Sequence, residues 1–156
     1  MKLKINEIYY SIQGESSYMG KPCIFIRLTY CNLRCTYCDS EYTFHEGNDM
    51  SIDKIVDEIK KYPCKLIEVT GGEPLFQKNC INLLEKLVEL KYDVLLETSG
   101  SLSIKDVPKE VVNIIDFKCP SSNMKKKNYW RNIQFIKPED EVKFVIGNKE
   151  DYDWAK

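Results

Sequence analysis

The stretch "PCIFIRLTYCNLRCTYCDS", residues 22–40, places a short β-rich run directly before three closely spaced cysteines. The run at 22–29 is short and apolar, which is typical of a buried strand. Cys31, Cys35 and Cys38 follow with C-x3-C-x2-C spacing, and no fourth cysteine comes after them at ligand spacing. Most metals held by cysteines take four protein ligands, so this loop raises the question of which group needs only three.

Short β-rich runs recur along the chain, and each ends in polar residues or glycine. They lie at 22–29, 66–71, 93–100, 113–118 and 141–147. The segment 6–15 precedes the first of them and predicts an additional N-terminal strand or hairpin.

Helical patterns separate these runs. Residues 52–59 carry apolar side chains at helical spacing after Ser51, a suitable N-cap. A second apolar stripe covers 81–91, a third short helix is predicted at 105–112, and "NKEDYDWAK" at the end of the chain predicts the start of another. Strands that alternate with helices predict an α/β fold of parallel β/α units joined by right-handed crossovers.

Composition narrows the class of protein. The chain has 156 residues, of which 43% are hydrophobic and 30% charged, and its net charge is −1. This balance indicates one globular domain and gives no strong field for binding nucleic acid. No apolar run approaches the length of about 18 residues that spans a membrane, and the start lacks a signal-peptide pattern. We therefore expect a cytoplasmic protein, in which seven cysteines indicate metal or redox chemistry rather than disulfides.

Polar clusters follow four of the predicted strands. They are the cysteine loop, "TGGEP" at 70–74, "ETSG" at 97–100 and "DFKCPSS" at 116–122. Because the carboxyl ends of parallel strands meet at one edge, we expect all four clusters to face a single pocket.

Two metal centres and one metal-free arrangement compete for the three cysteines. A structural zinc site needs a fourth ligand, and the sole histidine, His45, would have to complete a Cys3His set. An iron–sulfur cubane held by three cysteines leaves one iron open for a cofactor. The third alternative is a loop of buried thiols that bind nothing.

The cysteine spacing, with Tyr37 before the last cysteine, resembles the radical S-adenosylmethionine (SAM) enzymes. The resemblance implies a [4Fe–4S] cluster whose open iron binds the methionine part of SAM, and one electron then yields a 5′-deoxyadenosyl radical. "TGGEP" resembles the Gly-Gly-Glu motif of that superfamily, which implies that Gly72 and Glu73 contact the cofactor. Taken alone, the motif could equally be a turn at the end of a strand.

Within this superfamily the chain resembles the 7-carboxy-7-deazaguanine synthase family. The most specific pieces are "YSIQGE" at 10–15 and "CIFIRLTYCNLRCTYCDSEYTF" at 23–44. The family converts 6-carboxy-5,6,7,8-tetrahydropterin to 7-carboxy-7-deazaguanine on the pathway to queuosine, with loss of ammonia. Its fold is a partial (β/α) barrel of the radical SAM type with an N-terminal extension, it commonly forms homodimers, and it takes its electron from a donor such as flavodoxin or ferredoxin.

The resemblance also implies roles for individual residues. The pterin substrate should contact Ile12, Gln13, Gly14, Arg27 and Thr70. SAM should contact Tyr37, Cys38, Asp39, Gly72, Glu73, Glu97, Asp116 and Lys118. The metals should be held by Cys31, Cys35 and Cys38 for the cluster and by Ser40 for a magnesium ion.

Some of these roles have structural alternatives. Arg27 interrupts an apolar strand, and a buried guanidinium needs an anion, which could be a substrate carboxylate or the side chain of Glu15 or Glu73. The segment 13–15 could be an ordinary turn. Ser40 could be a helix cap or a loop hydroxyl bonded to the backbone.

The length of the chain bears on its domain organisation. We expect residues 1–156 to form a single radical SAM core domain. Because the family barrel has about six strands and closes its pocket with a C-terminal segment, the chain could be truncated at its C-terminus or could be a natural short form. Two other functions compete with the synthase. One is an activase that places a glycyl radical on a partner protein, and the other is a noncatalytic iron–sulfur protein.

Overall fold

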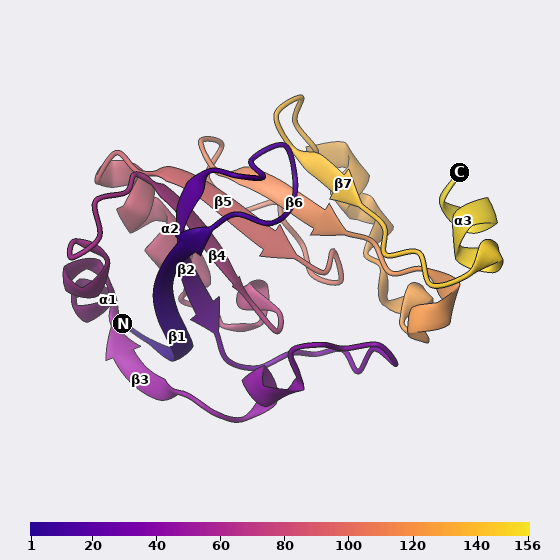
Figure 1. The fold of residues 1–156 in the computed structure, drawn as a ribbon, viewed down its shortest axis with the longest axis horizontal. Helices are drawn as coiled ribbons and strands as arrows, with labels where there is room; N and C mark the ends of the chain where they lie inside the picture. The colour runs from indigo at the N-terminus through magenta and orange to yellow at the C-terminus, as the bar shows by residue number, and fades with distance from the viewer.

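One sheet of seven strands forms the core of the protein. The computed structural model describes residues 1–156. The strands are β1 (Lys2–Ile12), β2 (Pro22–Leu28), β3 (Asn48–Ser51), β4 (Leu66–Gly71), β5 (Asp93–Thr98), β6 (Val112–Asp116) and β7 (Glu141–Lys143). They lie in the order β3-β1-β2-β4-β5-β6-β7, and the two edge strands do not pair with each other. The sheet curves without closing, as a partial barrel does (Figure 1).

The sheet combines two kinds of pairing. Strands β2, β4, β5, β6 and β7 are parallel neighbours, as the β/α alternation predicts. Strand β1 runs antiparallel to both β2 and β3, so the predicted N-terminal extension is a long strand that forms a hairpin with β2. The register of the β1–β2 pairing shifts between Ile5 and Glu7.

Side-chain alternation gives the sheet two different faces. On the outer face, apolar residues such as Ile26, Val69 and Leu96 pack with helices α1 (Ile52–Ile59) and α2 (Cys80–Glu89) into the main core. On the inner face, a smaller cluster of Cys23, Phe25, Leu66, Leu95 and Ile114 fills the sheet near the amino ends of the strands. Nearer the carboxyl ends the inner face carries charged residues instead.

Most predicted elements are confirmed, including the cap of α1. The Ser51 hydroxyl accepts a hydrogen bond from the Lys54 backbone N–H at 3.3 Å. Helix α3 (Lys149–Ala155) also forms where the C-terminal stretch predicts it. Strand β3 has no counterpart in the predictions, because its sequence "NDMS" is polar. None of the helices is long and apolar enough to cross a membrane.

The prediction of a helix at 105–112 is wrong. The segment between β5 and β6 forms isolated turns, closed by Val107 N–H to Ile104 C=O and Val111 N–H to Pro108 C=O. Pro108 has no N–H to donate and disfavours helical geometry in the residue before it. One proline in the middle of a short segment is therefore enough to prevent the helix.

Candidate functional site

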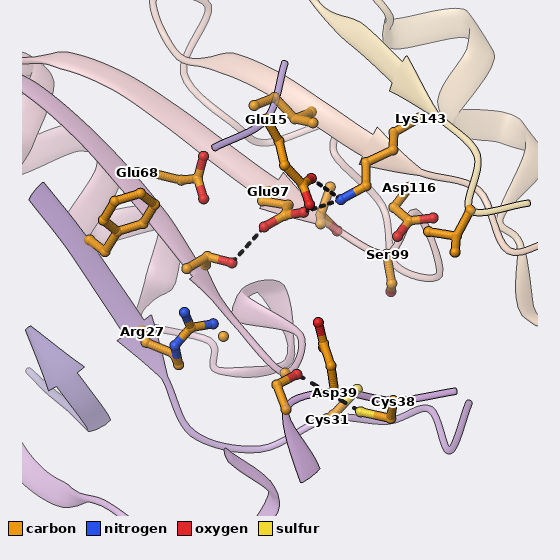
Figure 2. Close-up of a pocket in the computed structure, with 18 of the residues that line it drawn as sticks. Glu15, Arg27, Cys31, Cys38, Asp39, Glu68, Glu97, Ser99, Asp116 and Lys143 are labelled. Carbon is orange, nitrogen blue, oxygen red and sulfur yellow. Dashed lines mark hydrogen bonds and ion pairs between the residues drawn. The ribbon is translucent and has the colours of Figure 1, made fainter. Parts of the chain in front are cut away.

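A cavity of about 550 Å³ opens on the inner face of the sheet, at the carboxyl ends of the strands. The four predicted clusters all contribute to its walls, together with residues 11–15 of the β1–β2 hairpin and Lys143 of β7. Of the predicted site residues, the structure brings all but Glu73 to this cavity: Ile12, Gln13, Gly14, Arg27, Cys31, Cys35, Tyr37, Cys38, Asp39, Ser40, Thr70, Gly72, Glu97, Asp116 and Lys118. Figure 2 shows how the labelled side chains of this set point into one space.

The cysteine loop forms one wall of the cavity. Cys31, Cys35 and Cys38 are free, half-buried thiols. A turn closed by Cys38 N–H to Cys35 C=O shapes the loop, and Thr36 ties it to the segment after β6 by donating from its hydroxyl to the Ser121 carbonyl at 2.6 Å. The loop is therefore shaped by a local turn and tied to a segment that lies 85 residues away in the sequence.

The donor set fits a cubane cluster better than a single metal ion. No three His, Cys, Asp or Glu side chains lie close enough together to hold one ion. A [4Fe–4S] cubane needs three thiolates that each reach a different iron, and the three cysteines line one cavity with room beside them. His45 is exposed and does not line the cavity, so the Cys3His alternative has no support in the geometry.

Burial keeps two of these thiols protonated in the free protein. It raises the pKa of Cys31, against a hydrogen bond from the Leu33 N–H. It also raises the pKa of Cys35, although the nearby Lys118 charge opposes the effect. Cluster assembly must therefore remove protons from these thiols.

The two glycines of "TGGEP" let strand β4 end against the cysteine loop. A Cβ atom at Gly71 would lie 2.2 Å from the Leu28 carbonyl oxygen, and one at Gly72 would lie 2.4 Å from the Tyr30 oxygen and 2.7 Å from the Cys31 Cβ. The resemblance implies that Gly72 contacts the cofactor. The structure shows a further reason for glycine: only a residue without a side chain leaves room for the backbone next to Cys31.

Glu73 lies behind the cavity wall rather than in it. Its carboxylate is fully buried and accepts hydrogen bonds from the Leu75 N–H at 3.0 Å, the Ser99 N–H at 2.8 Å, the Ser99 hydroxyl at 2.5 Å and the Thr98 hydroxyl at 2.9 Å. Burial raises its pKa, and these hydrogen bonds oppose the rise. In this geometry Glu73 joins the end of β4 to the end of β5, so its predicted contact with SAM stays a prediction.

Arg27 projects into the cavity from β2 and has a protein anion as its partner. Its Nε donates to Glu7 Oε1 at 2.7 Å, and Nη2 donates to the Tyr9 hydroxyl at 2.9 Å. The partner is neither Glu15 nor Glu73, the two carboxylates that the sequence suggested. Glu7 stands opposite Arg27 in the β1–β2 register, which no sequence pattern revealed. No protein acceptor bonds to Arg27 Nη1, so the guanidinium keeps donors for a ligand.

Ser40 lies beside the last cysteine, with its hydroxyl 3.8 Å from Cys38 Sγ. It precedes a 3-10 turn at Glu41–Phe44, but its side chain makes no capping hydrogen bond. The capping alternative is therefore absent from the structure, and the hydroxyl remains available on the cavity side.

Two ion-pair networks line the opposite wall. Lys143 pairs with Glu15 and, at 3.0 Å, with Glu97, which also accepts from the Thr70 hydroxyl at 2.9 Å. Burial alone would raise the pKa of Glu97, but the Lys143 charge and these hydrogen bonds lower it overall. Figure 2 shows this network across the cavity from the cysteines.

The second network pairs Asp116 with Lys118 at 2.9 Å. Burial opposes the charge of Lys118, but Asp116 raises its pKa, so the lysine stays protonated. Asp116 Oδ1 and the Tyr37 hydroxyl are buried and have no hydrogen-bond partner in the protein. Unpaired buried polar atoms are costly, so both atoms point to a ligand in the cavity.

The sequence reasoning assigned no role to several polar residues of the cavity, among them Glu68, Ser99 and Lys143. A charged residue within an apolar strand was available as a signal for Glu68 and Lys143, as it was for Arg27. Ser99 had no comparable signal beyond its place in "ETSG".

Comparison with known proteins identifies the family of this chain. Residues 25–121 match the model of the radical SAM superfamily. The 7-carboxy-7-deazaguanine synthase of Koribacter versatilis is 51% identical over 99% of this chain and 69% of its own length, and that of Chlorobaculum tepidum is 43% identical over 99% of this chain and 71% of its own. The crystal structure of QueE from Escherichia coli superposes with a TM-score of 0.86 over 99% of this chain and 76% of that one, at 21% identity, which supports the fold. The chain therefore belongs to the 7-carboxy-7-deazaguanine synthase family of the radical SAM superfamily.

Proposed function

We propose that this chain converts 6-carboxy-5,6,7,8-tetrahydropterin to 7-carboxy-7-deazaguanine with loss of ammonia, as a radical SAM lyase. The observation that carries the proposal is one cavity that collects the three cysteines, the glycine turn and Arg27. The names of the relatives give the product, and the family resemblance implies the substrate and the loss of ammonia. The same comparisons do not favour the glycyl-radical activase.

The cysteine wall would hold the cluster and SAM. When bound, these groups supply the radical chemistry, while the protein positions the reactants and excludes water. Tyr37, Asp39 and Gly72 line the cavity beside the cysteines and would contact SAM. The unpaired atoms of Tyr37 and Asp116 offer hydrogen bonds to SAM, and Glu97 and Lys118 would contact it from the opposite wall.

Glu73 would then act as a positioning residue. By bonding to Thr98 and Ser99 it fixes the ends of two strands that present Gly72 and Glu97. A direct contact with the SAM ammonium would require its carboxylate to give up some of these hydrogen bonds.

The substrate carboxylate would bind to Arg27. Glu7 and Tyr9 hold two nitrogens of the guanidinium and so fix the direction of the third. A planar guanidinium that is already oriented loses little entropy when it binds a carboxylate. Ile12, Gln13, Gly14 and Thr70 complete the surroundings of the substrate.

The magnesium ion would bind at Ser40. Its hydroxyl has no backbone partner and lies 3.8 Å from Cys38 Sγ, and both residues line the cavity. Mg²⁺ prefers oxygen donors and often completes its octahedron with water and substrate oxygens, which the carboxypterin can provide. The ion would orient the substrate and stabilise developing negative charge.

Two partners complete the proposal. Radical SAM chemistry needs a one-electron reductant, and we propose a flavodoxin or ferredoxin for this role. We also propose a homodimer, as is common in the family.

Product analysis tests the proposal. The protein is reconstituted anaerobically with iron and sulfide, reduced, and incubated with SAM, Mg²⁺ and the carboxypterin. We expect 7-carboxy-7-deazaguanine, and we expect the triple Cys31→Ala, Cys35→Ala, Cys38→Ala variant to bind no iron above background and to form no product. Full iron content in the triple variant would overturn the cluster assignment, and a reconstituted wild type that turns over no carboxypterin would overturn the substrate.

A further inference from the structure

Glu68 is a buried carboxylate in the cavity that lacks a cationic partner. It lies on the inner face of β4 with a relative exposure of 4%. One of its oxygens, Oε2, accepts a hydrogen bond from the Gln13 side-chain amide at 2.5 Å. No protein donor bonds to the other oxygen, Oε1. A carboxylate this deeply buried is costly unless further donors reach it.

The other carboxylates on the inner faces of the strands are already compensated. Glu97 pairs with Lys143, and Asp116 pairs with Lys118. Glu68 forms no salt bridge. Its free acceptor capacity is therefore available to a ligand that brings N–H donors.

The register of the sheet places Glu68 one layer deeper than the Arg27 site. Arg27 is the neighbour of Thr70, whereas Glu68 is the neighbour of Phe25, two residues nearer the amino ends of the strands. At a strand rise of about 3.3 Å per residue, the two layers are roughly 7 Å apart. Figure 2 shows Arg27 and Glu68 on the same side of the cavity, with Arg27 nearer the cysteine loop.

The layer of Glu68 offers an apolar surface to a flat ring. Phe25 lines the cavity beside Glu68 and stacks on Tyr9 with ring centroids 5.0 Å apart, which provides an apolar surface at this depth. With the substrate carboxylate at Arg27, the opposite end of the ring would face the layer of Glu68. In a pterin that end is the aminopyrimidinone edge, which presents the ring N3–H and the 2-amino group side by side.

We propose that Glu68 binds this edge, with its carboxylate accepting hydrogen bonds from both N–H donors and so selecting a pterin over a ring that lacks the amino group. The inference rests on the proposed function and adds the residue that determines specificity. A carboxylate is acceptor-only and takes two parallel donors well. If a carbonyl replaced the amino group, one oxygen of the Glu68 carboxylate would face another acceptor and could form no hydrogen bond with it.

Gln13 is a positioning residue in this arrangement. Its amide nitrogen holds Glu68, and its amide oxygen accepts from the Glu15 N–H at 3.2 Å, so both ends of the side chain are fixed. Burial and the charge of Glu97 raise the pKa of Glu68 to about 7, and the Gln13 hydrogen bond opposes the rise. Two N–H donors from a ligand would stabilise the charged carboxylate further.

The test compares two ligands under anaerobic conditions by calorimetry. One is the carboxypterin, and the other is its 2-oxo counterpart, in which a carbonyl replaces the 2-amino group. We expect the reconstituted wild type with SAM to bind the carboxypterin roughly 10- to 100-fold more tightly, the range of a charged hydrogen bond. Glu68→Gln should lose most of this preference, because its amide offers a donor to the 2-oxo ligand. Arg27→Lys should reduce the affinity for both ligands by a similar factor.

The outcomes separate this inference from the proposed function. Iron content and the spectral change on adding SAM should be the same in wild type, in Glu68→Gln and in the surface control Glu85→Gln on α2. Equal affinity of the wild type for both ligands would overturn the role of Glu68 and leave the synthase proposal intact. A preserved preference in Glu68→Gln would do the same. If the wild type binds neither ligand, the proposal of a pterin substrate is itself wrong. This measurement uses the wild-type protein alone and so does not depend on the folding of any variant.

Discussion

Replacing Gly72 by alanine should damage the cysteine loop through a backbone clash. The added Cβ would lie 2.4 Å from the Tyr30 carbonyl oxygen and 2.7 Å from the Cys31 Cβ, roughly 1 Å inside ordinary van der Waals contact. The Tyr30 backbone cannot move freely, because its oxygen accepts from the Glu73 N–H at 2.9 Å and its N–H donates to the Thr43 carbonyl at 2.8 Å. Relief therefore requires a shift of the whole loop.

The magnitude follows from these contacts. Overpacking costs about 1–3 kcal/mol, and loss of the hydrogen bond between Glu73 and Tyr30 adds roughly 0.5–1.5 kcal/mol. We expect the free energy of unfolding of the metal-free Gly72→Ala variant to fall by about 2–4 kcal/mol, read from urea unfolding. Because Cys31 moves with the loop, iron bound per chain after anaerobic reconstitution should fall as well.

Gly14→Ala is the matched control. It lies on the same cavity, but its added Cβ would meet no atom within 4 Å. Stability and iron content should therefore stay at the wild-type values. If Gly72→Ala unfolds at the wild-type urea concentration and binds a full cluster, then the loop accommodates a methyl group and the reasoning from close approach is wrong.

Three further predictions follow from the cavity. Arg27→Lys keeps the charge but loses the planar contact, so carboxypterin affinity should fall by about 1–3 kcal/mol with SAM binding intact, and an unchanged dissociation constant would make Arg27 purely structural. Ser40→Ala should reduce turnover and its dependence on Mg²⁺ at unchanged iron content, and an identical magnesium titration would remove Ser40 as a ligand. Because the pKa of Glu68 is raised from 4.5 to about 7, its stabilising contribution is complete below about pH 4.5 and is lost as pH rises to about 7. The loss amounts to about 3 kcal/mol in the metal-free protein, and Glu68→Gln should flatten this part of the urea stability curve between about pH 4.5 and pH 7, the window set by the two pKa values.

The sequence located most of the cavity because two simple regularities hold in this fold. Apolar runs that end in polar residues marked the five parallel strands, and the carboxyl ends of parallel strands meet at one edge. Residues at or just after the ends of these strands, such as Cys31, Thr70 and Asp116, therefore lie together at the carboxyl edge of the sheet. The prediction needed no knowledge of side-chain contacts.

Contacts between segments that are distant in the sequence could not be predicted from local patterns. The pairing of Arg27 with Glu7 depends on the β1–β2 register, which includes an irregularity between Ile5 and Glu7. The orientation of Glu73 depends on hydrogen bonds to Thr98 and Ser99, about one β/α unit away. Local patterns cannot specify such partners, because several carboxylates compete for each cation.

The distribution of charge on the inner face links stability to ligand binding. In a closed (β/α) barrel, branched aliphatic side chains fill the interior and form a packed core. Here Arg27 and Glu97 occupy interior positions near the strand ends, and Glu68 lies one layer deeper, level with Phe25 and Leu95. These charged groups are poorly solvated and, for Glu68, incompletely paired in the free protein, so this part of the barrel is stabilised less than an apolar core would be. A ligand that supplies a carboxylate to Arg27 and N–H donors to Glu68 satisfies both groups at once and binds only the folded state, so the unfolding temperature should rise with ligand concentration. The features that weaken the empty barrel are therefore the same ones that give it selectivity.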